Sequence, residues 1–429
     1  IHADKATLYF VLSEFDRSRA EAERIVPLAR QIGDRMREAK ALAGIAWAAT
    51  WARDLDGAVA RAREAIQAAE PVGGEAVLAR AHLTIGFVRA VSGGLEEARD
   101  AIARALEASQ SGGEVADRSL VLSVAGLLRN WEADYEAAAG LQAEALALAR
   151  QHNLLVPLLI NFFMHGLTLA GKGDHEGALA LFREGLTFAE RVGDEAIHHR
   201  LLNCLGWVHA DLGDLERALE LNRRSAEVGR RRNDPGTFPN AEVNLGDVYL
   251  AKGDLALAAE HFESAYRFWE NPRTSQWMRW RYSMRLFASL GELGLARGDV
   301  ARAQESADRC LDLATRTNSR KNLVKGWRLR GEIALARREL EGAEDALRRA
   351  LSIAEAIGNP TQLWKTHAAW GRLLTARRRP HQAGEAYRAA RAVLDRVAGR
   401  LRDPILRASL GQAPDVREVY GLARAGEVS

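Results

Sequence analysis

Cysteine is scarce in this chain, which has only Cys204 and Cys310 among 429 residues. Two cysteines cannot build a disulfide framework or a zinc site of the CxxC type, so they indicate a reducing compartment. No run of about 18 apolar residues is present, which argues against a transmembrane span. The first twenty residues mix acidic and basic side chains, unlike a signal peptide. We therefore expect a cytoplasmic chain. Because it begins with Ile1 inside a helical pattern, we also expect it to be part of a longer protein.

Lysine is scarce as well, with seven residues against an abundance of arginine. The net charge of +3 hides a gradient, because residues 1–200 carry 22 basic and 28 acidic side chains and residues 201–429 carry 38 and 29. Acidic residues are nevertheless mixed through nearly every basic stretch. A nucleic-acid interface concentrates positive charge on one face, so we do not expect a nucleic-acid partner.

Sequence motifs of catalysis and nucleotide binding are missing. The chain has no GxxxxGK[ST], HExxH, GxSxG or GxGxxG motif, and Gly171-Lys172-Gly173-Asp174 has the composition of an ordinary turn between helices. Several histidines occur near Cys204, but their spacing is not the i, i+4 spacing of metal ligands, and packing explains them better: His165, His198, His199 and His209. We expect no enzyme activity, no cofactor and no metal.

The sequence does contain a 40-residue repeat. A small residue recurs and is followed twelve positions later by alanine, with one step of 45 in place of 40. The small residues are Ala46, Gly86, Gly126, Gly166, Gly206, Gly246, Gly291, Gly331 and Gly371; the alanines are Ala58, Ala98, Ala138, Ala178, Ala218, Ala258, Ala303, Ala343 and Ala383. Recurrence of the small residue predicts close helix crossing, where a side chain would collide with the alanine-bearing face of the second helix.

Turn-forming residues divide each unit into two helices. Gly-Asp turns such as Gly213-Asp214 separate the glycine from the alanine, and a second Gly or Asn ends most units, which is a signal for a helix C-terminus. Apolar residues follow the 3.6-residue helical period, and no stretch alternates as a strand would. We expect a solenoid over residues 1–398 and a C-terminal capping helix and tail over 399–429. Repeat breaks are expected near 33, 73, 113, 153, 193, 233, 273, 318 and 358.

The Gly-x11-Ala pattern, with a third small residue seven positions further on, resembles the tetratricopeptide repeat (TPR). The resemblance covers about residues 5–398 and is closest to the longer repeats of bacterial signalling proteins. It implies an all-α, right-handed superhelix of about nine to ten helical hairpins. Asp403-Pro404 is typical of a helix start, which predicts a capping helix from 404 to about 411.

The last third has a narrower resemblance. Segments such as Trp327-Arg-Leu-Arg-Gly331 and Leu363-Trp-Lys-Thr-His367 are similar to the C-terminal TPR region of bacterial multidomain regulators of the adenylate cyclase-like or maltose-regulator-like type. Those regulators carry an AAA/STAND-type ATPase. The resemblance implies ATPase or cyclase modules outside these residues.

A partner-binding groove is predicted on the first helix of each unit. In TPR-like arrays these helices line the concave face, and the residue after the small glycine shares a stripe with residues three, four or seven positions away. The stripe gives Trp47, Trp51, Phe87, Asn130, Trp131, Phe163, Arg200, Asn203 and Trp207, followed by Asn240, Asp247, Arg285, Lys325 and Arg328. Aromatic and arginine side chains dominate binding hot spots. The alternative is that the aromatic residues simply fill the inside of a tight superhelix.

The 45-residue step predicts a possible second surface. It contains Trp269, Trp277, Trp280 and Tyr282 interleaved with arginines, which could recognise an acidic partner or could equally hold a break in the repeat. We expect a non-catalytic TPR region that binds a protein or peptide partner and regulates a bacterial signalling protein. A peptide- or small-molecule-sensing domain of a transcriptional regulator is the alternative.

Overall fold

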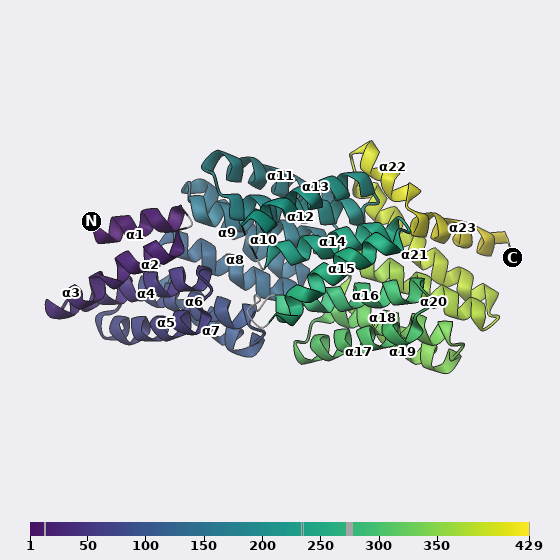
Figure 1. The fold of residues 1–429 in the computed structure, drawn as a ribbon, viewed down its shortest axis with the longest axis horizontal. Coiled ribbons are helices and arrows are strands. Elements are labelled where there is room, and N and C mark those ends of the chain that lie inside the picture. Colours follow the sequence, from purple (N-terminus) through teal and green to yellow (C-terminus); the bar gives the residue numbers. More distant parts are fainter. Residues whose placement is uncertain (13, 233, 235, 272–277, 429) are drawn as a thin grey trace. The chain divides into compact units, whose positions relative to one another are not determined.

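The structure is a computed structural model that describes the chain except residues 13, 233, 235, 272–277 and 429. The described residues form consecutive antiparallel helices and contain no strand (Figure 1). The predicted all-α, TPR-like solenoid is therefore confirmed. The 40-residue period corresponds to one hairpin of two helices, each usually 15 to 18 residues long.

Three helices precede the regular hairpins: α1 (His2–Val11), α2 (Phe15–Glu23) and α3 (Ile25–Gln31). The first hairpins are α4 (Arg35–Trp51) with α5 (Leu55–Ala69), α6 (Glu75–Val91) with α7 (Leu95–Ser111), α8 (Val115–Trp131) with α9 (Tyr135–Gln151), and α10 (Leu155–Lys172) with α11 (His175–Val192). The next are α12 (Glu195–Asp211) with α13 (Leu215–Arg231), α14 (Thr237–Ala251) with α15 (Leu255–Glu270), and α16 (Ser283–Ala296) with α17 (Val300–Arg316). The last are α18 (Arg320–Ala336) with α19 (Leu340–Ile357) and α20 (Pro360–Ala376) with α21 (Pro380–Arg400).

Turn chemistry sets the ends of these helices. In the α12–α13 turn, Gly213 adopts a φ of 76°, and the Asp214 side chain then accepts a hydrogen bond from the Arg217 backbone N–H. This pairing of a left-handed residue with an N-cap aspartate satisfies both helix ends. Left-handed residues also stand at several expected breaks: Gly33, Gly73, Asn153, Gly193, Asn318 and Gly358. The breaks expected near 233 and 273 fall on residues outside the described part.

The repeated glycines mark the closest helix contacts. A Cβ atom on Gly166 would lie 2.2 Å from Cε1 of Phe182, and one on Gly246 would lie 2.3 Å from Cε1 of Phe262. In both hairpins this side chain stands sixteen positions after the glycine, one helical turn after the repeat alanine and on the same, alanine-bearing face of the second helix that the sequence predicted. In the first hairpin, where alanine replaces the glycine, position +16 is also alanine: Ala46 faces Ala62.

The C-terminal end continues as helix. Asp403 caps α22 (Pro404–Gln412) by accepting from the backbone N–H groups of Ile405 and Leu406, which confirms the predicted capping helix. The segment expected to be a tail forms another helix, α23 (Pro414–Val428). Its Ala423 packs into a cluster with Leu374 and Tyr387, and this contact extends the apolar core to the end of the chain.

The chain divides into two compact units. Unit 1 comprises 1–129, 137–165 and 187–197, and unit 2 comprises 130–136, 166–186 and 198–429. One described helix, α10, is long and apolar enough to cross a membrane by composition, with a mean hydropathy of 1.3, although the sequence argument found no such run. Buried residues make up 67% of that segment, as they do in a core helix of a repeat.

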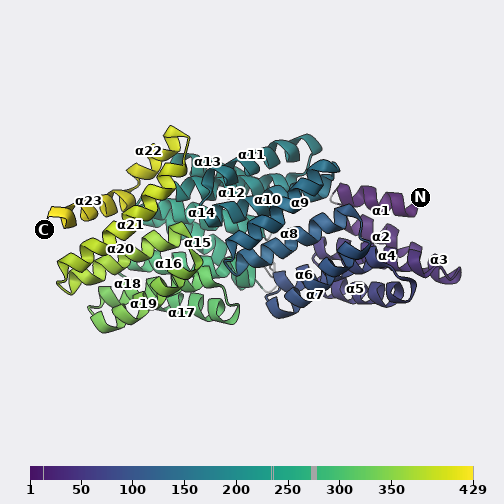
Figure 2. The same ribbon diagram turned by 180° about the vertical axis from the view of Figure 1, so that it is seen from behind.

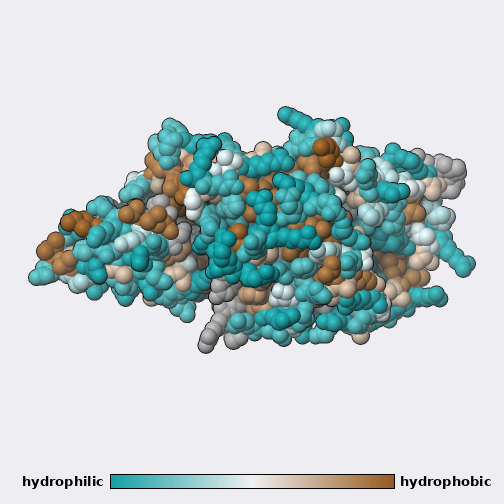
Figure 3. All heavy atoms as spheres, turned by 45° about the horizontal axis from the view of Figure 1, so that its top comes forward, coloured by the Kyte–Doolittle hydropathy of each residue, from teal (hydrophilic) through white to brown (hydrophobic). Residues whose placement is uncertain are grey.

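On the face drawn in Figure 3, hydrophilic side chains cover most of the surface and apolar ones occur in small groups. Five large apolar side chains among residues 1–32 are more than half exposed: Ile1, Leu8, Leu12, Leu28 and Ile32.

Candidate functional site

Unit 2 closes on itself. The Asn359 side chain, at the start of α20, donates a 2.7 Å hydrogen bond from Nδ2 to the Gly171 carbonyl in the α10–α11 turn, 188 positions earlier. In the same region, Glu176 accepts hydrogen bonds from the backbone N–H groups of Arg402 and Asp403. Helix α22 accordingly lies close to α13 in both views (Figures 1 and 2). Early and late hairpins of the superhelix therefore meet.

An apolar cluster seals this contact. Tyr135, at the start of α9, packs with Val324 of α18 and with Ile357 at the end of α19. Burial raises the pKa of the Tyr135 hydroxyl to about 12, so it stays protonated at neutral pH. Such a closed arrangement turns the first helices of the hairpins toward one another.

The closure defines an inner face of unit 2, formed by one stripe of side chains on each of α12, α14, α16 and α18. One contact across this face joins helices three hairpins apart: the Lys321 ammonium of α18 lies 5.0 Å from the centre of the Trp207 ring of α12. A cation over an indole face is an attractive pair when both are withdrawn from water. Trp207 and Lys321 are each half-buried.

Ion pairs between successive hairpins run along the inner face. Three arginines each contact an acid about one repeat earlier, and each acid directly follows a repeat glycine: Arg285 with Asp247 at 2.6 Å, Arg328 with Glu292 at 3.6 Å, and Arg372 with Glu332 at 2.6 Å. The Arg328 guanidinium also donates to Gln362 Oε1 at 2.9 Å. The predicted groove residues among them, Asp247, Arg285 and Arg328, are thus partly committed to holding neighbouring hairpins together.

Asparagines form a second network on this face. Asn240 donates to Oδ1 of Asn203 at 2.6 Å, and Asn203 donates to Oδ1 of Asn222 at 3.1 Å. Asn244 donates to the same Asn222 oxygen at 2.8 Å. Asn203, Asn222 and Asn244 are buried, whereas Asn240 is half-buried. Of the two asparagines predicted for the groove in this region, Asn203 is buried, and only Asn240 remains partly exposed on the inner face.

Two lysines on α18, unlike the three ion-paired arginines of this face, form no ion pair with any described residue. Lys321 and Lys325 stand four positions apart on one stripe, and neither has a carboxylate within ion-pairing distance among the described side chains. Burial, together with the neighbouring Lys325, lowers the pKa of Lys321 to about 7, while Asp211 opposes that shift. Burial and the nearby Arg285 also lower the pKa of Lys325. The groove prediction named Lys325 but missed Lys321, which the same i, i+4 spacing could have identified.

The predicted aromatic residues of unit 2 have different surroundings. Trp131 is 8% exposed, and its ring lies 5.5 Å from that of Trp280 and 5.2 Å from the Arg281 guanidinium. Burial lowers the pKa of Arg281 to about 10. Predicted Asn130 donates to the Thr168 hydroxyl at 2.9 Å, and predicted Arg200 donates to the Thr237 hydroxyl at 3.3 Å. Trp207 is the more open of the two predicted tryptophans.

The aromatic residues of unit 1 pack on one another. The ring of Trp51 stacks on Phe87 at 5.8 Å, and Trp47 contacts both rings. Trp47, Phe87 and Phe163 are buried, while Trp51 is half-buried. Arg80 lies over Trp47 and forms an ion pair with buried Asp117. This half of the predicted groove has the mutual packing that the alternative interpretation anticipated, and its role in binding stays a prediction.

The predicted second surface is not one cluster. Trp269 packs against Phe287 of α16 at 5.0 Å with Arg309 over its ring, whereas Trp280 contacts Trp131. A π-helical turn, Met278–Tyr282, carries Trp280 and half-buried Tyr282 into α16. Trp277 lies outside the described residues. The 45-residue step therefore places Trp280 against Trp131, within the segment 130–136 of unit 2.

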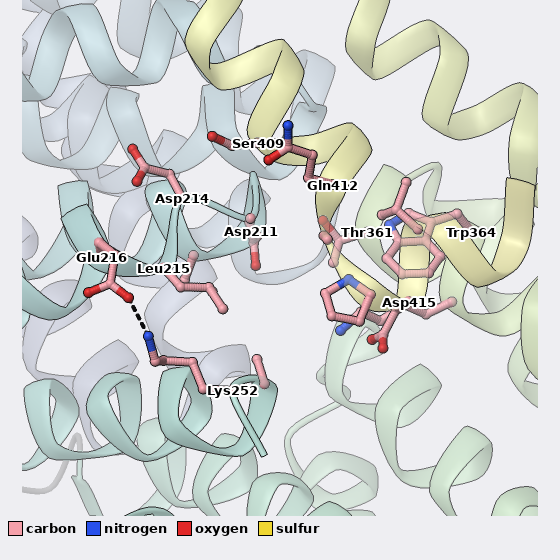
Figure 4. A pocket seen from close by; sticks show the side chains of 17 residues that line it. Asp211, Asp214, Leu215, Glu216, Lys252, Thr361, Trp364, Ser409, Gln412 and Asp415 are labelled. Atoms are coloured by element: carbon pink, nitrogen blue, oxygen red, sulfur yellow. Dashed lines mark hydrogen bonds and ion pairs between the residues drawn. The ribbon is translucent and has the colours of Figure 1, made fainter. Parts of the chain in front are cut away.

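A pocket of about 440 Å³ adjoins the inner face of unit 2. The α12–α13 turn forms one wall, and α20 with the α22–α23 junction forms the other (Figure 4). Asp211 projects into it from the end of α12, one helical turn after Trp207, opposite Trp364 and Asp415. At its edge, Glu216 forms an ion pair with Lys252. The pocket therefore extends the inner face with acidic and aromatic groups.

The histidines and cysteines have structural partners. His199 lies 3.1 Å from Asp234, and His209 lies 2.8 Å from Asp214, which caps α13. Burial raises the pKa of the Cys204 and Cys310 thiols to about 12, so neither is an activated nucleophile. Among the described residues, no group of three or more potential ligands is arranged to hold a metal ion.

The comparisons with known proteins show a similarity in fold alone. No protein-family model and no curated protein matches the chain. A solved structure of a Rap protein in complex with competence and sporulation factor has a TM-score of 0.66 at 13% identity, covering 85% of this chain and 99% of that one. The Rap conjugation gene regulator of plasmid pLS20 in complex with the Phr* peptide has a TM-score of 0.55 at 14% identity, covering 71% and 85%. The apo quorum sensor NprR from B. thuringiensis has a TM-score of 0.51 at 12% identity, covering 86% and 99%. These likenesses show that the chain has a TPR-like α-solenoid fold.

Proposed function

We propose that this chain is a non-catalytic peptide receptor, and that the inner face of unit 2 binds an extended segment of a partner. The observation that carries the proposal is the Trp207–Lys321 contact, which brings opposite helices of a closed superhelix together around half-buried polar groups. Side chains of this kind can bind both the backbone and the side chains of a peptide, because they offer donors, acceptors and an aromatic face.

The similarity in fold also supports a peptide-binding function. One structural neighbour was solved in complex with the Phr* peptide, which supports a peptide as the ligand of this chain. Asn240 keeps part of its amide on the inner face, where it can pair with a peptide backbone. In this proposal, the peptide contacts six half-buried residues of the predicted groove: Arg200, Trp207, Asn240, Asp247, Arg285 and Lys325.

Regulation of a signalling protein is the finer part of the proposal. Each hairpin contacts mainly its neighbours, so a ligand that changes the angle between hairpins can alter an attached module. Asn359 and Glu176 are well placed to respond, because they join hairpins far apart in sequence. An ATPase or cyclase module attached outside these residues would be the recipient.

Affinity selection from a random hexapeptide library tests the proposal. The purified chain is incubated with the library, retained peptides are identified by mass spectrometry, and their Kd values are measured by calorimetry. We expect Trp207→Ala and Asn240→Ala each to weaken binding by about tenfold or more, the effect of losing a central contact.

Trp327→Ala provides the matched control. Trp327 is also half-buried on a first helix, but Arg330 and Arg349 lie over its ring, and Arg349 belongs to the second helix of its hairpin. Its removal should leave the Kd unchanged. A library with no retained peptide, or equal Kd values for all three variants and the native chain, would overturn the proposed function.

A further inference from the structure

The inner face of unit 2 has a local excess of positive charge on α18. Its stripe there reads Lys321, Lys325, Arg328 and Glu332. Arg328 contacts Glu292, and Glu332 accepts a hydrogen bond from Arg372. Glu292 and Glu332 are therefore already engaged by arginines, and Lys321 and Lys325 have no carboxylate within 4 Å in the described part of the chain. Asp247 and Glu292 act on Lys325 from further away.

The surroundings of Lys321 add cations and few anions. The groups that face it electrostatically are Lys325, Asp211, Arg281, Arg285 and His175. Arg285 is neutralised by Asp247, and Arg281 donates to the Ser319 hydroxyl at 3.1 Å. Asp211 is thus the one acid among these groups, set against two lysines and Arg281. Holding unpaired ammonium groups inside a protein is costly unless a ligand supplies the opposite charge.

We infer that Lys321 and Lys325 form the binding site for a carboxylate of the peptide that occupies the inner face. This inference rests on the proposed function and specifies the chemistry of its ligand. The face of the Trp207 ring fixes the Lys321 stem from one side, so its ammonium and that of Lys325 act as a pair of donors one helical turn apart. Lysines bind a carboxylate as point charges, without a bidentate geometry. A free C-terminus and an acidic side chain both supply that group.

Two forms of the hexapeptide library separate these sources. One form has a free C-terminal carboxylate, and the other has a C-terminal amide. If the C-terminus binds, the native chain retains peptides from the free-acid form alone. If a side chain binds, it retains peptides rich in Asp or Glu at one position from both forms. Either result supports the inference. Retained peptides with no preference for a carboxylate overturn it and leave the proposed function standing, whereas retention of no peptide overturns both.

Variants then assign the preference to the lysines. Lys321→Met with Lys325→Met should weaken binding of the selected carboxylate peptide at least about 30-fold, as expected for losing a desolvated charge pair. The amide or Gln counterpart of that peptide should lose much less. Lys321→Arg with Lys325→Arg should restore the preference, because the charge returns.

A charge-matched control excludes a general electrostatic effect. Lys40 is exposed on α4, and Lys172 is ion-paired with Glu136, so Lys40→Met with Lys172→Met removes the same charge away from the site. Circular dichroism confirms that every variant is folded. Equal weakening by the two double variants, or an unchanged preference in the Lys321/Lys325 variant, would overturn the assignment.

Discussion

The close approach at Gly246 provides a direct test of the packing that defines the repeat. Replacing Gly246 by alanine places a Cβ 2.3 Å from Cε1 and 2.5 Å from Cδ1 of Phe262, a fully buried ring. Ordinary contact begins at about 3.4 Å, so the ring or the helix must move by about 1 Å. Overpacking of this kind typically costs about 1–3 kcal/mol. Alanine is favoured over glycine in a helix by about 1 kcal/mol, which offsets part of that loss.

A double-mutant cycle separates the two effects. Phe262→Ala alone is expected to lower the free energy of unfolding by about 3–5 kcal/mol, because it leaves a cavity. In that background the clash is gone, so adding Gly246→Ala should raise stability by about 1 kcal/mol through helix propensity. The expected interaction energy between the two sites is about 1–3 kcal/mol. The first hairpin already has this arrangement, with alanine at both Ala46 and Ala62.

Urea unfolding followed by circular dichroism at 222 nm measures each corner of the cycle. Gly421→Ala is the control, since Gly421 lies in the middle of α23, is exposed and has no atom within 4 Å of an added Cβ. It should be stabilising by up to about 1 kcal/mol. The clash between Gly246 and Phe262 is refuted if Gly246→Ala raises the free energy of unfolding as Gly421→Ala does. It is also refuted if Gly246→Ala has the same effect on stability with and without the Phe262 ring.

Two further predictions concern closure and charge in unit 2. Asn359→Asp keeps an acceptor for the Gln362 N–H but loses the donor to the Gly171 carbonyl, so it should cost about 1–3 kcal/mol in urea unfolding; equal stability of Asp and Asn would contradict the closure. Burial lowers the pKa of Lys321 to about 7 from 10.5, so the folded state binds fewer protons than the unfolded state between these values and stability rises with pH there. Lys321→Met should therefore be more stable than the native chain at pH 6, with a difference that shrinks toward pH 10, and an equal difference at both pH values in thermal unfolding would contradict this. Five other titratable or charged groups face the Lys321 ammonium and also affect this pH dependence: Asp211, His175, Arg281, Arg285 and Lys325.

Local sequence rules predicted the helices and their turns well. In Gly213-Asp214, the glycine takes the left-handed conformation and the aspartate caps the next helix; in Asp403-Pro404, the aspartate is the cap and the proline is the first helical residue. These interactions span only a few positions, so they can be predicted without tertiary contacts. The spacing of Gly246 and Ala258 likewise encodes one hairpin. The predicted collision with the alanine-bearing face of the second helix is confirmed, and the side chain that an added Cβ would meet there is Phe262, one helical turn after Ala258.

By itself, the sequence determined an all-α array of hairpins, since helix period, capping and small-residue spacing are short-range properties that repeat every forty residues. Only the tertiary structure decided which stripe residues are open and which are buried, because small angles between hairpins accumulate along the array. That accumulation brings Asn359 to Gly171 and Lys321 to Trp207. It also buries Trp131 against Trp280 and leaves Trp207 and Lys321 half-buried, distinctions that no single repeat contains.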